Sequence, residues 1–246
     1  MARGRTTDGP LVVYGTNAVE GALRSTAGVR RVAVLRGRPA PRIVELARAR
    51  RLAVEELDHA GLERLAGTPH HQGAVVLGDP YRYSAIEDVI APERGSVLAL
   101  DSVQDPRNFG AIIRTARAAG VGGIVVPQDR SVGVTGVVAA TSAGCLFDLP
   151  IARVPNLARA LGTLKDAGFW LVGLVAGAER SVFDLPDLER PAIVAGGEGE
   201  GLRPLVRRGC DFEASLPMAA GVESLNVSVA TAIALYEIVV RRRRRG

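Results

Sequence analysis

Four glycines alternate with two glutamates in the segment GGEGEGL, residues 196–202, directly after the apolar run PAIVA. A glycine-rich loop after a strand is typical of phosphate sites, which present backbone N–H groups to an anion. Glu198 and Glu200 would repel that ligand. The glycines also miss the G-x-G-x-x-G spacing of dinucleotide-binding turns, and the single lysine, Lys165, lies elsewhere. Charge and spacing therefore both argue against a phosphate-binding loop.

A second segment, LDSVQDPRNFGAIIRTARAAGV (residues 100–121), combines turn residues with a helical pattern. Asp105 and Pro106 predict a turn, and Asn108 is a candidate cap for the helix that follows. Apolar residues form one stripe of this helix, and Arg114 falls outside it. An ordinary capped helix with a solvated arginine face explains the same pattern, so this segment alone does not establish a functional site.

A third segment, SLPMAAGVESLNVSVATAIALYEIVVRR (residues 215–242), places Ser224, Asn226 and Ser228 ahead of a helix that is apolar on nearly all sides. A helix without a polar face must be buried, either by its own domain or by a second subunit. A core helix whose hydroxyl groups bond back to the backbone explains this segment equally well.

The elements that position these segments form two α/β regions. Up to residue 78, helical patterns at GTNAVEGALRS, PAPRIVELARARR and HAGLERLAG alternate with strand patterns at RVAVLR, LAVEEL and QGAVVLG. A turn-rich linker covers 79–95. Over 96–246, strands at VLAL, GGIVV, FWLVGLV and PAIVA alternate with helices at NFGAIIRTARAAG, 134–145 and NLARALGTLKDAG. Strands alternating with helices predict a parallel sheet covered by helices. Such sheets bind ligands at the carboxyl ends of their strands, where the three segments are expected.

Composition favours a protein of the cytoplasm that binds a polyanion. The 31 basic and 26 acidic residues give a net charge of +5, and residues 1–80 hold 12 arginines against 8 acidic residues. Codon composition could also produce the arginine excess. The longest apolar run is roughly half of what a membrane span requires, so we expect no membrane partner.

The cysteines, two adjacent histidines and a C-terminal run of arginines are further candidates for metal or RNA binding. The two cysteines are too few for a disulfide framework or a metal site, and adjacent His70 and His71 cannot form a simple metal pair on one strand face. We therefore expect no metal. The arginine tail at 241–245 is either a solvated terminus or a source of sequence-independent attraction to RNA.

Together the three segments resemble the three motifs of the SpoU (TrmH) family of RNA 2′-O-ribose methyltransferases, within the SPOUT superfamily. The matching stretches are DPRNFGAIIRTARAAGV, GGEGEGL and LPMAAGVESLNVSVATAIALYE, in the family's order and at comparable separations. YGTNAVEGAL and HQGAVVLG resemble the small substrate domain of the RlmB-like subgroup, so the resemblance covers almost the whole chain.

The resemblance implies an α/β fold with two domains. Residues 1–78 would form a small ribosomal-protein-like (L30e-like) domain that binds the RNA substrate, and 79–95 the linker. Residues 96–246 would form a trefoil-knotted parallel-sheet SPOUT methyltransferase domain. The implied partners are RNA, as 23S ribosomal RNA or a ribosomal precursor particle, and a second copy of the chain in a homodimer.

The implied activity is S-adenosylmethionine-dependent 2′-O-methylation of a ribose, most simply on a guanosine of 23S ribosomal RNA. Transfer RNA or another ribosomal nucleotide, including a drug-resistance site, is an alternative target. A non-catalytic RNA-binding assembly factor is an alternative of another class, whereas the glycine spacing disfavours a nucleotide-dependent oxidoreductase. The cofactor has no phosphate and a net positive charge, so glutamates in the loop are compatible with it.

By resemblance, two groups of residues form the site. Arg114 would stabilise the developing alkoxide, because a guanidinium stays protonated and cannot act as a literal base. The catalytic set is Arg114, Asn108, Glu198, Ser224 and Asn226, and the cofactor-binding set is Gly196, Leu216, Met218 and Leu225. Phe147, Gly197 and Glu223 depart from the family's usual pattern, and they leave the RNA target open.

Overall fold

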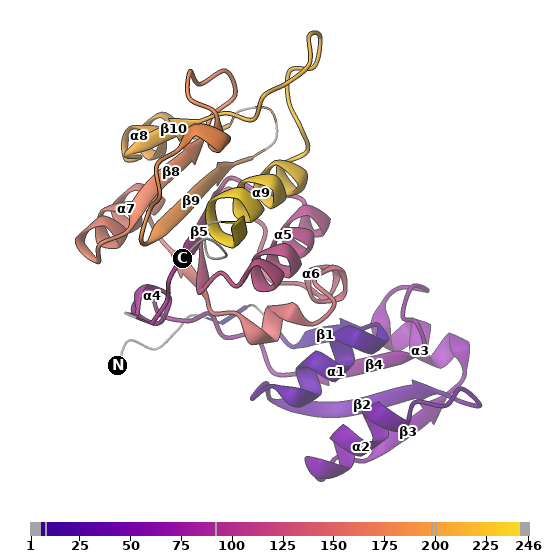
Figure 1. Cartoon of the computed structure of the whole chain (residues 1–246). Coiled ribbons are helices and arrows are strands. Elements are labelled where there is room, and N and C mark those ends of the chain that lie inside the picture. Colours follow the sequence, from indigo (N-terminus) through magenta and orange to yellow (C-terminus); the bar gives the residue numbers. More distant parts are fainter. Residues whose placement is uncertain (1–5, 8, 92, 198, 200, 242–246) are drawn as a thin grey trace. The chain divides into compact units, whose positions relative to one another are not determined.

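The protein is described from a computed structural model that covers residues 6–7, 9–91, 93–197, 199 and 201–241. The contacts divide this chain into two compact units (Figure 1). The N-terminal unit comprises Thr6–Arg82 together with Gly133–Asp148, and the C-terminal unit comprises 83–132 and 149–241. The sequence did not indicate that Gly133–Asp148 would group with the N-terminal unit.

The N-terminal unit is built on a four-stranded mixed sheet with the order β1-β4-β2-β3. Strand β4 runs antiparallel to β1 and β2, and β2 runs parallel to β3. The bounds are β1 Leu11–Tyr14, α1 Thr16–Arg24, β2 Val29–Leu35, α2 Pro41–Ala49, β3 Val54–Leu57, α3 His59–Ala66 and β4 Ala74–Gly78. All were predicted from the sequence except β1, which follows directly on the N-terminal polar segment.

Helix α6 (Gly136–Thr141) and the 3₁₀ helix Cys145–Asp148 complete this unit. The sequence predicted one helix from Val134 to Cys145, but Ala143 and Gly144 adopt left-handed backbone conformations that end it. Gly21 and Gly144 allow α1 to approach this segment closely, because a Cβ on Gly21 would lie 2.9 Å from the Gly144 Cα and one on Gly144 would lie 2.7 Å from the Asn17 carbonyl oxygen.

The C-terminal unit has a six-stranded, fully parallel sheet with the order β10-β8-β9-β5-β6-β7, as predicted for this region. The strands are β5 Val97–Asp101, β6 Gly123–Pro127, β7 Ile151–Val154, β8 Trp170–Leu174, β9 Pro191–Gly196 and β10 Phe212–Ala214. All five residues of β5 are buried, as expected for a central strand covered on both faces. Strands β7 and β10, of four and three residues, were not predicted from the sequence.

Helices cover both faces of this sheet (Figure 1). On one face α4 (Ile86–Ile90), α7 (Leu157–Asp166) and α8 (Pro204–Arg208) contribute to a buried cluster with β5, β8 and β9. On the other, α9 (Val227–Leu235), continued by a π-helical turn over Tyr236–Arg241, contacts α5 (Pro106–Ala119) and β9. Strand order alone does not define a knot, so the trefoil knot stays a prediction.

Candidate active site

The three segments meet at the carboxyl edge of the C-terminal sheet. Strands β5 and β9 pair in register from Val97 with Ala192 to Asp101 with Gly196, so the chain leaves both strands at the same edge. A pocket of ≈ 420 Å³ lies there, within the size range of small-molecule sites. Its described lining comes from all three segments: Ser102, Val103, Gln104, Asp105, Asn108, Gly197 and Val227.

Asp105, and not Asn108, caps helix α5. The Asp105 carboxylate accepts hydrogen bonds from the backbone N–H groups of Arg107 at 2.6 Å and Asn108 at 3.3 Å. Because Pro106 occupies the first helical position, the cap falls one residue before it. The predicted cap was therefore wrong, and Asn108 lies within the first helical turn.

The Asn108 side chain instead contacts the third segment. Its Oδ1 accepts a hydrogen bond from Asn226 Nδ2 at 3.1 Å. Asn226 caps α9, because its Oδ1 accepts from the Ser228 backbone N–H at 2.9 Å and from Ser228 Oγ at 2.6 Å. Because Oδ1 is held by these bonds, the Nδ2 group of Asn226 is the end of the amide that points toward Asn108. The structure thus brings Asn108 and Asn226 together across 118 residues of sequence.

Arg114 lies on the exposed face of α5, as the sequence pattern predicted. The buried face of the helix carries Phe109, Ile112, Ile113 and Ala116. Among the described residues, Arg114 has no hydrogen-bond or ion-pair partner and does not line the pocket. Its predicted role in the reaction stays a prediction.

The glycines of the second segment allow backbone segments to approach closely. A Cβ on Gly196 would lie 2.2 Å from the Gly201 carbonyl carbon, and one on Gly197 would lie 2.3 Å from the Ser102 carbonyl oxygen. The loop folds back on itself, and the Gly201 N–H donates to the Gly197 carbonyl at 3.3 Å. Side chains at 196 and 197 would therefore disrupt the pocket wall. Glu198, predicted as a site residue, and Glu200 lie outside the described residues.

The remaining predicted residues lie on the connection from β10 to α9, which extends beyond the sheet (Figure 1). Leu216 and Met218 are half-buried, whereas Ser224 and Leu225 are exposed. None of these four lines the pocket described above. Their assignment to cofactor and substrate binding stays a prediction.

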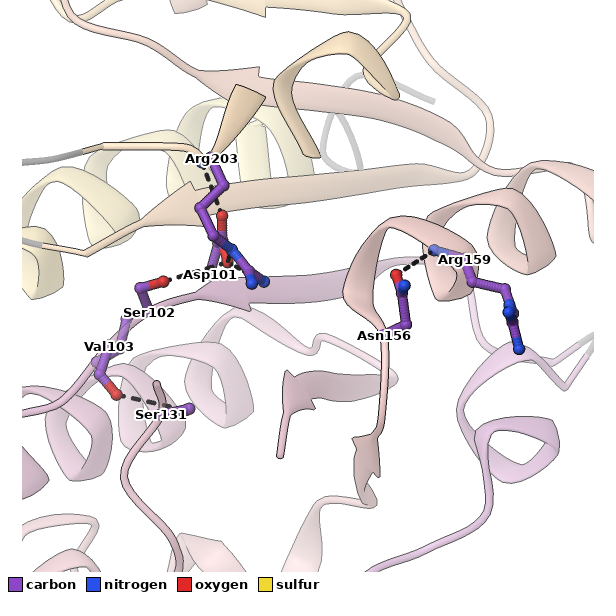
Figure 2. A network of polar contacts seen from close by, with 7 residues as sticks. All are labelled: Asp101, Ser102, Val103, Ser131, Asn156, Arg159 and Arg203. Atoms are coloured by element: carbon purple, nitrogen blue, oxygen red, sulfur yellow. Dashed lines mark hydrogen bonds and ion pairs between the residues drawn. The ribbon is translucent and has the colours of Figure 1, made fainter. Parts of the chain in front are cut away.

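Two residues of the site edge, Asp101 and Arg203, were not singled out from the sequence (Figure 2). The Asp101 side chain is fully buried, and its Oδ1 lies 2.7 Å from both Nε and a terminal nitrogen of the Arg203 guanidinium. Its Oδ2 accepts from the Arg203 backbone N–H at 2.9 Å. An aspartate directly after the apolar run VLAL was the available signal, because a buried carboxylate requires partners.

The next two residues of the β5 loop are also held in place. Ser102 has a left-handed backbone with φ of 63°, which is uncommon outside glycine and concentrates at functional sites. The Val103 carbonyl accepts a hydrogen bond from Ser131 Oγ at 3.3 Å (Figure 2). It also accepts one from the Val132 N–H at 2.9 Å. One wall of the pocket is therefore fixed by contacts outside the three motifs.

The two histidines considered from the sequence lie in the turn before β4, not on a strand. His71 is buried, its Nδ1 accepts from the Gly73 N–H at 3.0 Å, and its ring contacts His59. Burial lowers the pKa of His71, which favours its neutral form. In the described part of the chain, no group of three or more potential ligands could hold a metal ion.

The positions that depart from the family pattern lie in different places. Phe147 is half-buried in the 3₁₀ helix of the N-terminal unit, and Glu223 is exposed on the connection before α9. Arg241 forms an ion pair with Glu237, and the rest of the arginine tail lies outside the described residues. No described helix has the length and apolar character to cross a membrane.

Two protein-family models match the chain, one over each of its two regions. The model of the SpoU rRNA Methylase family matches residues 95–236, and that of RNA 2′-O ribose methyltransferase substrate binding matches 12–84. The chain is 40% identical to the 23S rRNA (guanosine-2′-O-)-methyltransferase RlmB of Xanthomonas campestris, over 94% of this chain and 96% of that protein. It is 41% identical to an uncharacterized tRNA/rRNA methyltransferase of Synechocystis, of which it spans 53%.

A solved structure has the same fold over nearly the whole chain. The SpoU methyltransferase AviRb from Streptomyces viridochromogenes, in complex with the cofactor AdoMet, superposes with a TM-score of 0.80. The two sequences are 28% identical, and the match covers 97% of this chain and 92% of that one.

Proposed function

Because the chain belongs to the SpoU rRNA methylase family, we propose that it transfers a methyl group from S-adenosylmethionine to a ribose 2′-hydroxyl of RNA. The observation that carries this proposal is the bond between Asn108 and Asn226 beside a pocket built from all three motifs. By analogy with the Xanthomonas relative, the proposed target is a guanosine of 23S ribosomal RNA. The proposed location of the reaction is the cytoplasm.

The lining of the pocket fits this cofactor. Its described side chains are neutral or acidic, and none of the described lining residues is basic. Such a site suits a ligand with a sulfonium and an ammonium group and does not suit a dinucleotide. When bound, S-adenosylmethionine supplies a methyl group attached to an excellent leaving group. Gly196 and Gly197 would allow the backbone to approach it, and Leu216, Met218 and Leu225 would contribute apolar contacts from the connection before α9.

The protein's remaining tasks are to align the ribose and to increase the nucleophilicity of its 2′-oxygen. Asn108 and Asn226, whose amides orient each other, would bind the ribose and its phosphate together with Ser224 and Glu198. Arg114 would lie beside the 2′-oxygen and stabilise negative charge as it develops there. Its guanidinium keeps its proton, so an RNA phosphate is the proposed proton acceptor.

The N-terminal unit is the proposed docking module for RNA. Residues 12–84 match a substrate-binding family, and residues 1–80 carry 12 arginines against 8 acidic residues. Such an excess attracts a phosphate backbone without reading its sequence. Target choice would therefore depend on RNA shape.

A homodimer is also part of the proposal. Val229, Ile233 and Tyr236, spaced by four and three residues along the last helix, have exposed fractions of 46%, 36% and 50%. These three residues, here called the α9 stripe, form an apolar strip that is exposed to water in the single chain. A second copy of the same helix is the partner that we propose to cover it.

Methyl transfer to separate RNA classes tests this function. The full chain is incubated with methyl-labelled S-adenosylmethionine and either ribosomal or transfer RNA that lacks modifications. We expect label in one position of 23S ribosomal RNA. Label in transfer RNA would replace the proposed substrate, whereas cofactor binding without transfer to either RNA would favour the non-catalytic assembly factor.

A further inference from the structure

We propose that Asp101 and Arg203 are positioning residues that hold the described residues of the glycine loop, Gly197, Gly199, Gly201 and Leu202, in the arrangement that binds the cofactor. Neither residue lines the described pocket, so the pair would act through the loop and not by touching the ligand. The inference rests on the proposed function for the identity of the ligand. The contacts that carry it are properties of the protein itself.

Both ends of the glycine loop are attached to Asp101. At the beginning, Gly196 pairs with Asp101 in the parallel ladder between β9 and β5. At the end, Arg203 donates its backbone N–H and its Nε–H to the Asp101 carboxylate, and a terminal guanidinium nitrogen lies 2.7 Å from Asp101 Oδ1. Asp101 therefore lies at both ends of the loop, through backbone pairing at the beginning and through its buried side chain at the end, where Figure 2 shows its contact with Arg203.

Because the Asp101 carboxylate is buried, loss of its contact with Arg203 carries a large free-energy cost. The Asp101 side chain has no exposed surface, whereas that of Arg203 is 32% exposed. A buried carboxylate is strongly destabilised when its cation is removed, so loop conformations that withdraw Arg203 are disfavoured. A loop held in one conformation loses less entropy when a ligand binds, which strengthens binding without changing the chemical step.

A second arginine ion pair, on the helix that follows Arg203, provides a matched control. Arg207 of α8 donates Nε and a terminal nitrogen to the Glu213 carboxylate at 2.7 and 2.6 Å. Both arginines place Nε and a terminal nitrogen against one carboxylate, but Arg207 contacts both Glu213 oxygens, joins α8 to β10 and is exposed. Arg207→Ala therefore removes an arginine ion pair from α8 without detaching the glycine loop.

Calorimetric titration with S-adenosylmethionine compares wild type with Arg203→Ala, Arg203→Lys and Arg207→Ala. We expect Arg203→Ala to raise the Kd about tenfold, equivalent to about 1.4 kcal/mol. Arg203→Lys should give an intermediate Kd, because its ammonium keeps the charge without the guanidinium geometry. Arg207→Ala should stay within about twofold of wild type, since exposed pairs contribute little. At saturating cofactor, all four proteins should have similar kcat and the same KM for RNA.

A purely structural role predicts other results. If Arg203→Ala lowers the melting temperature but leaves the Kd unchanged, or lowers kcat at saturating cofactor, the pair does not position the glycine loop. Asp101→Asn keeps an acceptor for the Arg203 N–H but removes the charge. Its effect on the Kd should not add to that of Arg203→Ala, because both changes break one contact.

Hydrogen exchange separates this inference from the proposed function. Without any ligand, the amides of residues 197–202 should exchange faster in Arg203→Ala than in wild type or Arg207→Ala. Equal exchange in the three proteins would overturn the positioning role. If the exchange rates differ in this way but the wild-type protein does not bind S-adenosylmethionine, the positioning role would stand and the proposed function would be contradicted.

Discussion

At the scale of single residues, two asparagines and one arginine carry the proposed chemistry. Asn108 and Asn226 lie in different motifs and are joined by one hydrogen bond, which positions each amide before a substrate binds. Arg114 is exposed on the same helix as Asn108. A site prepared in this way for charge that develops during the reaction needs no reorganisation at the reacting oxygen.

Replacing Arg114 tests its proposed electrostatic role. Arg114→Ala should leave the Kd for S-adenosylmethionine unchanged and reduce methyl transfer about a hundredfold or more, as for a lost oxyanion donor. Calorimetry and single-turnover transfer measure the two quantities. Arg117→Ala, which removes another exposed arginine of α5, should transfer normally. Unchanged transfer by Arg114→Ala would remove this residue from the mechanism.

Replacing Asn226 separates its structural role from its role in the site. Asn226→Ser keeps a good helix cap but cannot reach Asn108, so it should retain thermal stability and lose transfer. Asn226→Ala should lose transfer and in addition about 1 kcal/mol of stability, the usual contribution of an N-cap. Thermal unfolding and transfer assays measure these effects. If both variants transfer at the wild-type rate, the bond to Asn108 has no part in the reaction.

At the scale of elements, the close approach of two loops forms one wall of the pocket. The glycine loop contacts the turn after β5, where Gly197 lies against the Ser102 carbonyl. Strand pairing between β5 and β9 determines where this contact occurs. The glycines thus serve the backbone geometry of the site, which explains their presence beside glutamates.

A methyl group on Gly197 should therefore weaken cofactor binding. Gly197→Ala places a Cβ 2.3 Å from the Ser102 oxygen, so one of the two loops must move. We expect calorimetry to show a Kd at least about tenfold higher, or about 1.4 kcal/mol of lost binding. The control is Gly162→Ala on α7, where a Cβ meets nothing within 4 Å. That variant should bind normally and gain about 0.5–1 kcal/mol of stability. Equal Kd values for both variants would refute this account of the loop.

Sequence patterns predicted the long elements and the motifs better than the short elements. Helices such as α5 and α7 and the buried strand β5 have clear periodicity or a continuous apolar run. The three residues of β10 are too few to show one, and β1 was not predicted. The link between Asp101 and Arg203 depends on strand pairing over about a hundred residues, which a local pattern does not contain.

At the scale of the whole molecule, a fully apolar C-terminal helix predicted burial by the domain or by a second subunit. The structure supplies part of this burial: Ala234 and Leu235 are inside the C-terminal unit, whereas the α9 stripe remains exposed. The sequence alone could not separate the two faces, because both are apolar. Their separation depends on where α9 contacts α5 and β9.

Charges on the α9 stripe test the proposed dimer. Ile233→Asp with Tyr236→Asp should give a folded monomer in sedimentation experiments, because two carboxylates would face their copies across a two-fold interface. Leu205→Asp, at an apolar position with an exposed fraction of 64% on α8, should leave the assembly unchanged. A wild-type monomer at micromolar concentration, or a dimer that persists in the double variant, would contradict this arrangement.

The position of the transferred methyl group tests the central claim most directly. Ribosomal RNA lacking modifications is incubated with the protein and S-adenosylmethionine and is then digested to nucleosides. Mass spectrometry measures the masses of the ribose and base fragments of each nucleoside. The proposed site predicts that wild type adds one methyl group to the ribose at the 2′-oxygen and that Arg114→Ala adds almost none. A methyl group on a base, or equal transfer by both proteins, would contradict the account.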